Sequence, residues 1–235
     1  MPNIKERPIL FSAPMIRALL AGTKKQTRCT IKGEPDLVRW SPIAISGVSG
    51  WEDEHGRPIR CPYGHLGDRL WVREKWRIGA WDADRGMFAL DYCDGPRKEW
   101  LLPMATAVEE ANEVFERLWI ECSDELDAKG ATHDADGQYS WRPGESPLRW
   151  RPSIHMPRWA SRILLEITDV RVERLQDISE EDAVAEGGPV DHPNGTARGW
   201  FEQLWEKLNG AGSWDANPWV WVIEFKRIEE AACKP

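Results

Sequence analysis

Two side chains in one short turn are of types that can do covalent chemistry together. Lys24 and Thr27 stand three residues apart, directly after Gly22. A threonine hydroxyl is a weak nucleophile that needs an adjacent base. A lysine serves as that base only when burial or a neighbouring cation depresses its pKa, and Lys25 and Arg28 are the nearest cations in sequence. In an arbitrary turn such residues are more often simply solvated, so a functional role for them depends on how the surrounding elements position them.

The segments around this turn are expected to form a strand, a helix and a second strand. Residues 7–11 have the pattern of a short strand, and Pro14 suits the first turn of a helix that begins after Ser12. Apolar residues then recur at helical spacing until Gly22, which suits a C-cap. The helix should therefore end at Gly22 or one residue earlier, and the chain should re-enter a strand over 23–31.

The middle of the chain carries weaker signals. Residues 33–66 are rich in glycine, proline, serine and charge, which predicts loops with short strands. Alternation predicts a strand over 69–76 and a second strand over 88–92. Helical patterning follows over 105–120, and the polar, glycine-rich stretch 121–147 is expected to be a long loop.

A basic and aromatic stretch follows. Within residues 141–162, arginines alternate with tryptophans: Arg142, Arg149, Arg151, Arg158 and Arg162 with Trp141, Trp150 and Trp159. Three interpretations stay open: a lid over a pocket, an RNA-contacting surface, or arginines that neutralise acidic residues elsewhere.

The last third of the chain is the clearest part. Alternation predicts a strand over 161–175, and Ser179 is a good N-cap, with Asp182 at the third helical position. That helix should run to Glu186, before two glycines. A second amphipathic helix should end at Asn209-Gly210, and a closing strand covers 219–228. This order of elements predicts an α+β fold with helices packed around a small curved sheet or barrel.

Bulk properties narrow the class of protein. The chain has 235 residues, 41% of them hydrophobic, which fits one globular domain or one domain with a large insertion. A net charge of -8 disfavours a general nucleic-acid binder, but not an enzyme that binds one nucleoside. No apolar stretch approaches the ~20 residues that span a bilayer, and the N-terminus has no apolar signal-peptide run. We therefore expect a cytoplasmic protein without a membrane partner.

Cysteine and tryptophan usage adds two expectations. The five cysteines form no C-x-x-C pair, which fits reduced thiols. Cys61 and His65 have near-ligand spacing, but no second pair completes a zinc site. Most of the 15 tryptophans should be core, including Trp71, Trp76 and Trp221, and a few could hold a base.

The segment Gly22-Thr23-Lys24-Lys25-Gln26-Thr27-Arg28-Cys29 resembles the signature turn of the ASCH family, which shares its fold with RNA-binding PUA domains. The resemblance extends to Gly67-Asp68, to the junction at 175–180 and to the strand at 221–226. Residues 94–158 match nothing in the minimal members, and the whole chain is similar to larger ASCH proteins of phages and prophages. The resemblance implies a single domain over 1–235, a small PUA-like β-barrel with flanking helices, whose insertion at about 94–158 forms a lid or an extra subdomain.

Some small bacterial ASCH proteins are amidohydrolases that remove the acyl group from N(4)-acetylcytidine. By position, the resemblance implies Thr27 as the nucleophile, Lys24 as the base and Glu186 as the acid that protonates the leaving N4 amine. It also implies a nucleoside substrate, with no metal and no other cofactor. The residues expected to bind substrate are Gly22, Arg28, Arg73, Trp150, Arg158 and Trp159.

One position departs from the family pattern. The family carries an arginine two residues after the threonine, where this chain has Cys29. Either Arg28 takes over that role in a different register, or a contact is missing and the chain binds its ligand without efficient turnover. Taken alone, Glu186 would be read as an exposed carboxylate at a helix end.

Two other functions remain open. The first is a non-enzymatic PUA-like module that binds RNA or a modified base, motivated by the arginines and tryptophans of 141–162. The second is a role in phage assembly or host interaction, which rests only on the phage-like character of the chain. The sequence does not define the oligomeric state.

Overall fold

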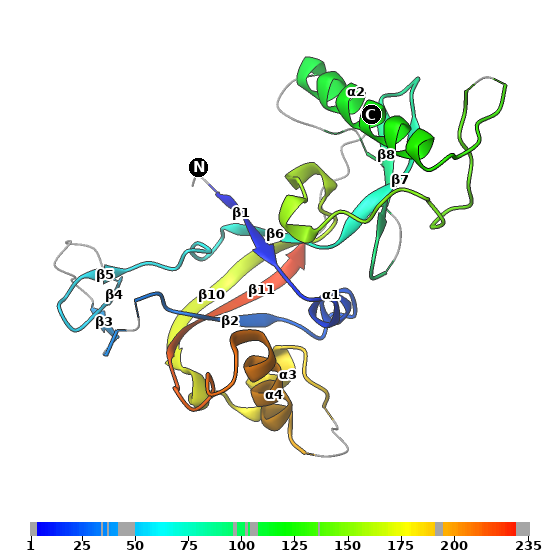
Figure 1. The fold of residues 1–235 in the computed structure, drawn as a ribbon. Helices are drawn as coiled ribbons and strands as arrows, with labels where there is room; N and C mark the ends of the chain where they lie inside the picture. Colours follow the sequence, from blue (N-terminus) through cyan, green and yellow to red (C-terminus); the bar gives the residue numbers. More distant parts are fainter. Residues whose placement is uncertain are drawn as a thin grey trace. The chain divides into compact units, whose positions relative to one another are not determined.

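The computed structural model describes residues 4–33, 35–36, 38–41, 50–95, 98–101, 103, 108–135, 137–190 and 195–228. The chain divides into two compact units (Figure 1). The first comprises Met1–Ile9, Arg17–Leu70 and Ile163–Pro235, and the second comprises Leu10–Ile16 and Trp71–Arg162. The stretch 94–158, expected as an insertion, lies inside the second unit.

A five-stranded sheet forms the framework of the first unit. Its strand order is β1 (Glu6–Leu10), β6 (Arg69–Arg73), β10 (Leu164–Arg174), β11 (Trp219–Ile228) and β2 (Gln26–Thr30). β11 pairs antiparallel with both β10 and β2. In the described part of the chain this order is open, with β1 and β2 at the edges. The α+β class is therefore confirmed.

Two helices cover one face of β11. α3 (Glu180–Ala185) and α4 (Ala197–Asn209) pack against Val220 and Val222 through a buried apolar cluster (Figure 1). Their ends follow the predicted capping signals. The Ser179 hydroxyl accepts from the Asp182 N–H, and α4 ends at Asn209, before Gly210. A 3-10 turn, η3 (Leu175–Asp177), links β10 to α3.

The N-terminal helix also follows its sequence signals. α1 covers Ala13–Leu20, and Gly22 has a φ of 75°, the left-handed conformation that a glycine adopts at a helix end. Short strands lie within 33–66, as expected: β3 (Arg39–Ser41), β4 (Gly50–Glu52) and β5 (Pro58–Ile59) form a small antiparallel sheet.

The second unit is a three-stranded sheet packed against one long helix. β7 (Trp76–Asp82), β8 (Met87–Tyr92) and β9 (Lys98–Leu101) are antiparallel neighbours. α2 (Val108–Ala128) buries one apolar stripe against them, and two 3-10 turns follow, η1 (Ser153–His155) and η2 (Arg158–Ala160). The stripe consists of Phe115, Leu118, Cys122 and Leu126.

Two predictions for this region were wrong. The helix does not give way to a loop after residue 120, because Cys122 and Leu126 continue its buried stripe and α2 runs to Ala128. The predicted start near residue 105 lies outside the described residues. The strand expected over 69–76 is broken at Glu74, whose buried carboxylate is held by both Nε and Nη2 of Arg162 at 2.8 and 2.7 Å.

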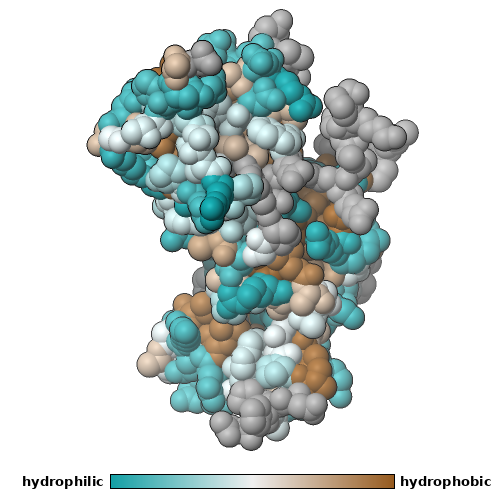
Figure 2. Space-filling view, turned by 90° about the vertical axis from the view of Figure 1, so that its right-hand side faces the viewer, coloured by the Kyte–Doolittle hydropathy of each residue, from teal (hydrophilic) through white to brown (hydrophobic). Residues whose placement is uncertain are grey.

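The surface shown in the space-filling view is mostly hydrophilic, with hydrophobic residues in separate groups (Figure 2). No helix among the described residues is both long enough and apolar enough to cross a membrane.

Candidate functional site

The turn after α1 is fixed between two distant elements of the first unit. The backbone N–H groups of Thr23 and Lys24 both donate to the Ala18 carbonyl, at 2.9 and 3.2 Å. The Lys25 N–H donates to the Ala185 carbonyl at the end of α3. The Lys25 carbonyl accepts from Phe225 on β11. The turn therefore has a fixed position beside the C-terminal end of α3.

This position brings Lys24 into contact with Glu186. The Lys24 ammonium donates to Glu186 Oε2 and to the Glu186 backbone carbonyl, both at 2.9 Å. The two side chains are 0% and 1% exposed. Two residues that are 162 positions apart thus form a fully buried ion pair, and Glu186 is not the exposed helix-end carboxylate that its sequence position alone would suggest.

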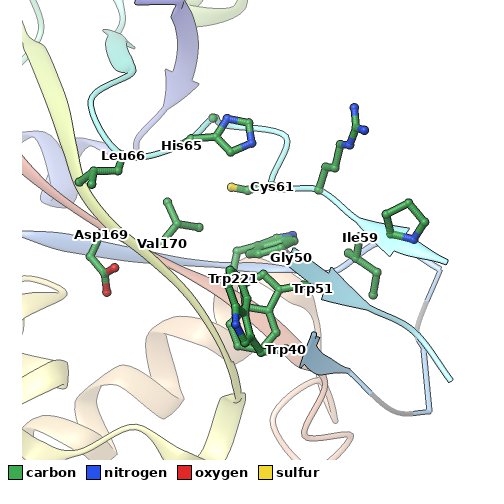
Figure 3. A pocket seen from close by; sticks show the side chains of 13 residues that line it. Trp40, Gly50, Trp51, Ile59, Cys61, His65, Leu66, Asp169, Val170 and Trp221 are labelled. Atoms are coloured by element: carbon green, nitrogen blue, oxygen red, sulfur yellow. The ribbon is translucent and has the colours of Figure 1, made fainter. Parts of the chain in front are cut away.

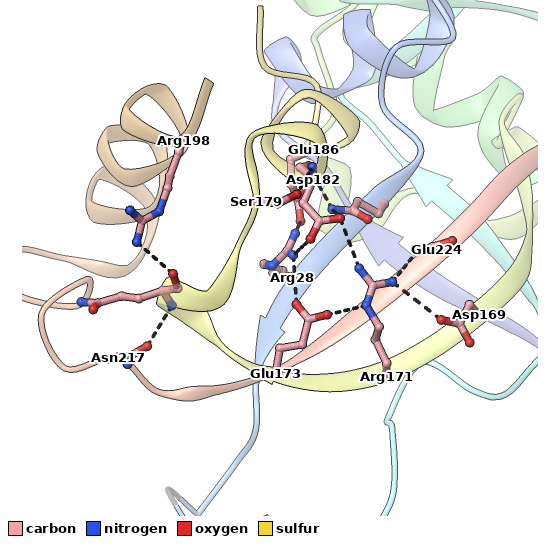
Figure 4. Close-up of polar contacts among 12 residues, drawn as sticks. Arg28, Asp169, Arg171, Glu173, Ser179, Asp182, Glu186, Arg198, Asn217 and Glu224 are labelled. Carbon is pink, nitrogen blue, oxygen red and sulfur yellow. Dashed lines mark hydrogen bonds and ion pairs between the residues drawn. The ribbon is translucent and has the colours of Figure 1, made fainter. Parts of the chain in front are cut away.

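Arg28 completes this pair from the neighbouring strand. Its Nη1 donates to Glu186 Oε1 at 3.1 Å (Figure 4). Because Lys24 holds Oε2, both oxygens of the carboxylate are held by cations. Its Nη2 donates to Asp182 at 2.8 Å and to Glu173 at 3.1 Å. The guanidinium is fully buried, and its carbon lies 5.9 Å from the centre of the Phe201 ring. Such a guanidinium is fixed by its three carboxylates.

A second arginine extends the charged cluster toward the sheet. Arg171 on β10 pairs with Glu173 at 2.5 Å, with Asp182 at 3.2 Å and with Glu224 of β11 (Figure 4). These partners of Arg28 and Arg171 were not recognised in the sequence. The available signal was the alternation of β10, which puts 171 and 173 on the face that α3 covers.

The cluster sets the protonation of Asp182. Burial acts to raise the pKa of this carboxyl group, but the charge of Arg28 and the hydrogen bonds from Gln26 and Arg28 outweigh burial. The pKa of Asp182 is therefore lower than its ordinary value.

The side chain of Thr27 lies on the face of β2 opposite to that of Arg28. Gln26 and Arg28 both donate to Asp182, so these two side chains face α3. Successive side chains of a strand alternate, so Thr27 and Cys29 face the opposite side, beside their register partners Ile223 and Trp221. The structure thus brings Lys24, Arg28 and Glu186 into direct contact and sets the buried Thr27 on the face opposite to Arg28.

The charges of Lys24 and Glu186 also affect the neighbouring residue Cys29. Burial raises the pKa of the Cys29 thiol to about 11, and a hydrogen bond with Tyr63 opposes that rise. The charge of Glu186 raises the same pKa and the charge of Lys24 lowers it. Cys29 is therefore a neutral thiol at neutral pH, and it lies within electrostatic reach of Lys24 and Glu186.

Four of the residues expected to bind substrate belong to the second unit: Arg73, Trp150, Arg158 and Trp159. The Arg73 guanidinium lies 4.7 Å from the ring of Trp71, and the guanidinium of Arg77 lies 4.4 Å from the ring of Trp150. Trp159 packs edge-on against Trp76 in the core, and Arg158 begins the half-buried turn η2.

The basic stretch is paired with the acidic face of α2. Arg149 contacts Glu121 at 2.6 Å, and Arg151 contacts the same carboxylate at 3.2 Å. The Arg149 N–H also donates to Glu125. These contacts favour the interpretation in which the arginines neutralise acidic residues.

Among the described residues, no group of three or more histidine, cysteine, aspartate or glutamate side chains is arranged to hold a metal ion. No family model, curated protein or solved structure matches this chain.

Proposed function

We propose that the first unit is an ASCH-type, PUA-like domain that removes the acyl group from N(4)-acylated cytosine nucleosides. The observation that carries the proposal is the buried contact between Lys24 and Glu186, at 2.9 Å. Resemblance to the family selects these two positions as base and acid, and they are 162 positions apart in the chain. A contact between them is what a shared catalytic role requires.

The contact supplies a route by which a lysine becomes a base. Transfer of one proton from Lys24 Nζ to Glu186 Oε2 gives a neutral amine beside a carboxylic acid. Arg28 occupies Oε1, so Oε2 is the oxygen that carries the proton. The neutral amine then takes the proton of the Thr27 hydroxyl as that oxygen adds to the acyl carbonyl.

The same pair completes the first half-reaction. Glu186 returns its proton to the N4 nitrogen, the carbon–nitrogen bond breaks, and the cytosine nucleoside leaves as a neutral amine. The acyl group stays on Thr27 as an ester, and Lys24 and Glu186 are again an ion pair. In the second half-reaction a water molecule replaces the nucleoside, and one proton passes again from Lys24 to Glu186. Lys24 then takes a proton from the water as its oxygen adds to the ester carbonyl. The bond to the Thr27 oxygen breaks, Glu186 protonates that oxygen, and the carboxylic acid leaves.

Two features of the chain bear on the rate. Thr27 lies on the face of β2 opposite to Arg28, so the attack requires that the Lys24 amine also reach the Thr27 hydroxyl. Cys29 itself stands where the family has an arginine, and a neutral thiol provides no charge for an oxyanion there. We expect turnover to be slower than in a protein with the family arginine.

The test is incubation of the purified protein with N(4)-acetylcytosine, N(4)-acetylcytidine and longer-chain N(4)-acylcytidines. Product chromatography should show the deacylated base or nucleoside and the free acid. Lys24→Gln, Thr27→Val and Glu186→Gln should each abolish release, while Thr27→Ser should keep part of it. Full activity in folded Thr27→Val protein would contradict the assignment of Thr27 as the nucleophile. If the wild type hydrolyses none of these acyl compounds, the proposed function is wrong.

A further inference from the structure

A cavity of about 500 Å³ opens on the first unit, between the small sheet β3–β5 and strands β10 and β11 (Figure 3). Its volume lies in the range of cavities that bind small molecules. Val170 and Trp221 contribute to its wall from the face that also carries Thr27 and Cys29. The cavity therefore lies on the face of the sheet opposite to Arg28 and Glu173.

Three tryptophans from separate elements gather in this cavity, as Figure 3 shows. Trp221 is buried, Trp51 is half-buried, and Trp40 is 55% exposed. The rings of Trp40 and Trp51 meet nearly edge to face, with centroids 5.4 Å apart and planes at 73°. Aromatic faces at two orientations suit a flat ring that stacks on one of them and meets the edge of another.

The mouth of the cavity exposes apolar surface to water. Leu66 is 73% exposed and borders the cavity together with Trp40. Large apolar side chains that remain exposed beside a concave site often mark a binding surface. A ligand seated there would cover part of both side chains, which favours binding through the hydrophobic effect.

The charges around the cavity indicate an uncharged ligand. Arg60 and Asp169 line it with opposite charges, and His65 adds a polar ring. The Asp169 carboxylate also lies 3.7 Å from the Arg171 guanidinium. A cage for an organic cation needs carboxylates that are free to balance it, and a site for a phosphate group needs several cations. The lining fits neither ligand.

We propose that this cavity binds a planar, uncharged aromatic heterocycle of nucleobase size, stacked on its tryptophan faces. Base–aromatic stacking contributes enough affinity per ring to support such binding without a dense set of hydrogen bonds. This site requires neither Lys24 nor Glu186. It therefore goes beyond the proposed hydrolysis and does not depend on it.

The test is isothermal titration of the whole chain with adenosine, guanosine, cytidine and uridine, with ribose as the non-aromatic control. We expect saturable binding of at least one nucleoside and none of ribose. Trp51→Ala and Trp40→Ala should each weaken that binding about tenfold or more. Trp119→Ala, which removes a comparably exposed tryptophan of α2 in the second unit, should leave it unchanged.

Two further variants separate this site from the proposed active site and from a folding defect. Lys24→Gln, which should abolish hydrolysis, should leave the affinity for a purine nucleoside within about twofold. Trp51→Phe keeps an aromatic face and should retain most of the affinity. The proposal is overturned if no nucleoside binds at millimolar concentration, or if Trp40→Ala protein with a wild-type circular dichroism spectrum binds normally. It is also overturned if Lys24→Gln protein with a wild-type spectrum does not bind.

Discussion

Replacing Glu186 by glutamine should destabilise the protein strongly, even though a glutamine side chain has nearly the same shape as a glutamate side chain. The carboxylate is 1% exposed and accepts from Lys24 and from Arg28. An amide can accept through its oxygen only, so its NH₂ group would face one of the two cations. The Lys24 ammonium would lose the carboxylate oxygen to which it donates at 2.9 Å.

Breaking a buried pair by removing one partner costs about 3–5 kcal/mol, because the remaining charge is neither paired nor solvated. In a chain of this size each kcal/mol lowers the melting temperature by roughly 2–4 °C, which gives a fall of roughly 6–20 °C. Urea unfolding followed by circular dichroism measures the free energy directly, and a thermal scan measures the temperature.

Glu166→Gln provides the matched control. Glu166 pairs with Lys226 at 2.8 Å, but those side chains are 31% and 59% exposed. Exposed pairs contribute about 0–1 kcal/mol, so this variant should stay close to the wild type. The double variant Lys24→Met with Glu186→Leu should recover much of the loss, because it leaves no unpaired charge and Arg28 keeps Glu173 and Asp182. If Glu186→Gln costs less than about 1 kcal/mol, the pair is not buried as the structure has it.

Three further outcomes follow from the first unit and its thiols. Because the pKa of Asp182 is lowered in the folded protein, its contribution to stability is present above about pH 4 and is lost as pH falls through the folded-state pKa. The stability of Asp182→Asn should therefore fall less steeply with acid than that of the wild type. Parallel curves of stability against pH for the two proteins would contradict this. Iodoacetamide at pH 8 should modify the exposed Cys93 well before Cys29, since a thiol of pKa about 11 is ionised in roughly one molecule in 1,000. Equal rates in peptide mapping would contradict the raised pKa of Cys29. In urea unfolding, Gly187→Ala should lower the free energy of unfolding more than Gly210→Ala does, by about 1 kcal/mol or more. Both glycines have positive φ, but of the two only Gly187 would place a Cβ 3.0 Å from a side chain of α1. Equal losses would show that this contact does not matter.

Local signals were enough to predict most helix ends and the two long strands. Pro14 and Gly22 set the limits of α1 to within about two residues, and Ser179 was correct as the N-cap of α3. These signals work because a capping side chain or a left-handed glycine satisfies the backbone within a few residues of its own position. β10 and β11 were predicted by alternation, since one face of each is buried along most of its length.

Properties that depend on distant partners could not be read from the sequence. Glu186 is buried because residues 24 and 28 reach it from another part of the chain, and nothing near residue 186 signals this. The opposite orientation of Thr27 requires the register between β2 and β11. Trp40 and Trp51 lie in a region interpreted as loops, so the cavity that they line could not be predicted.

The strand order of the five-stranded sheet has a consequence for folding during synthesis. β2 is one of the first strands to leave the ribosome, yet it pairs with β11, the last strand that the structure describes. Pairings between such distant segments form slowly and late. Residues 71–162 are continuous in the chain and emerge in full before β11 does, so the second unit can acquire most of its structure first. Until β11 arrives, β2 is without its ladder partner, and the nascent chain is most exposed to misassociation at that stage.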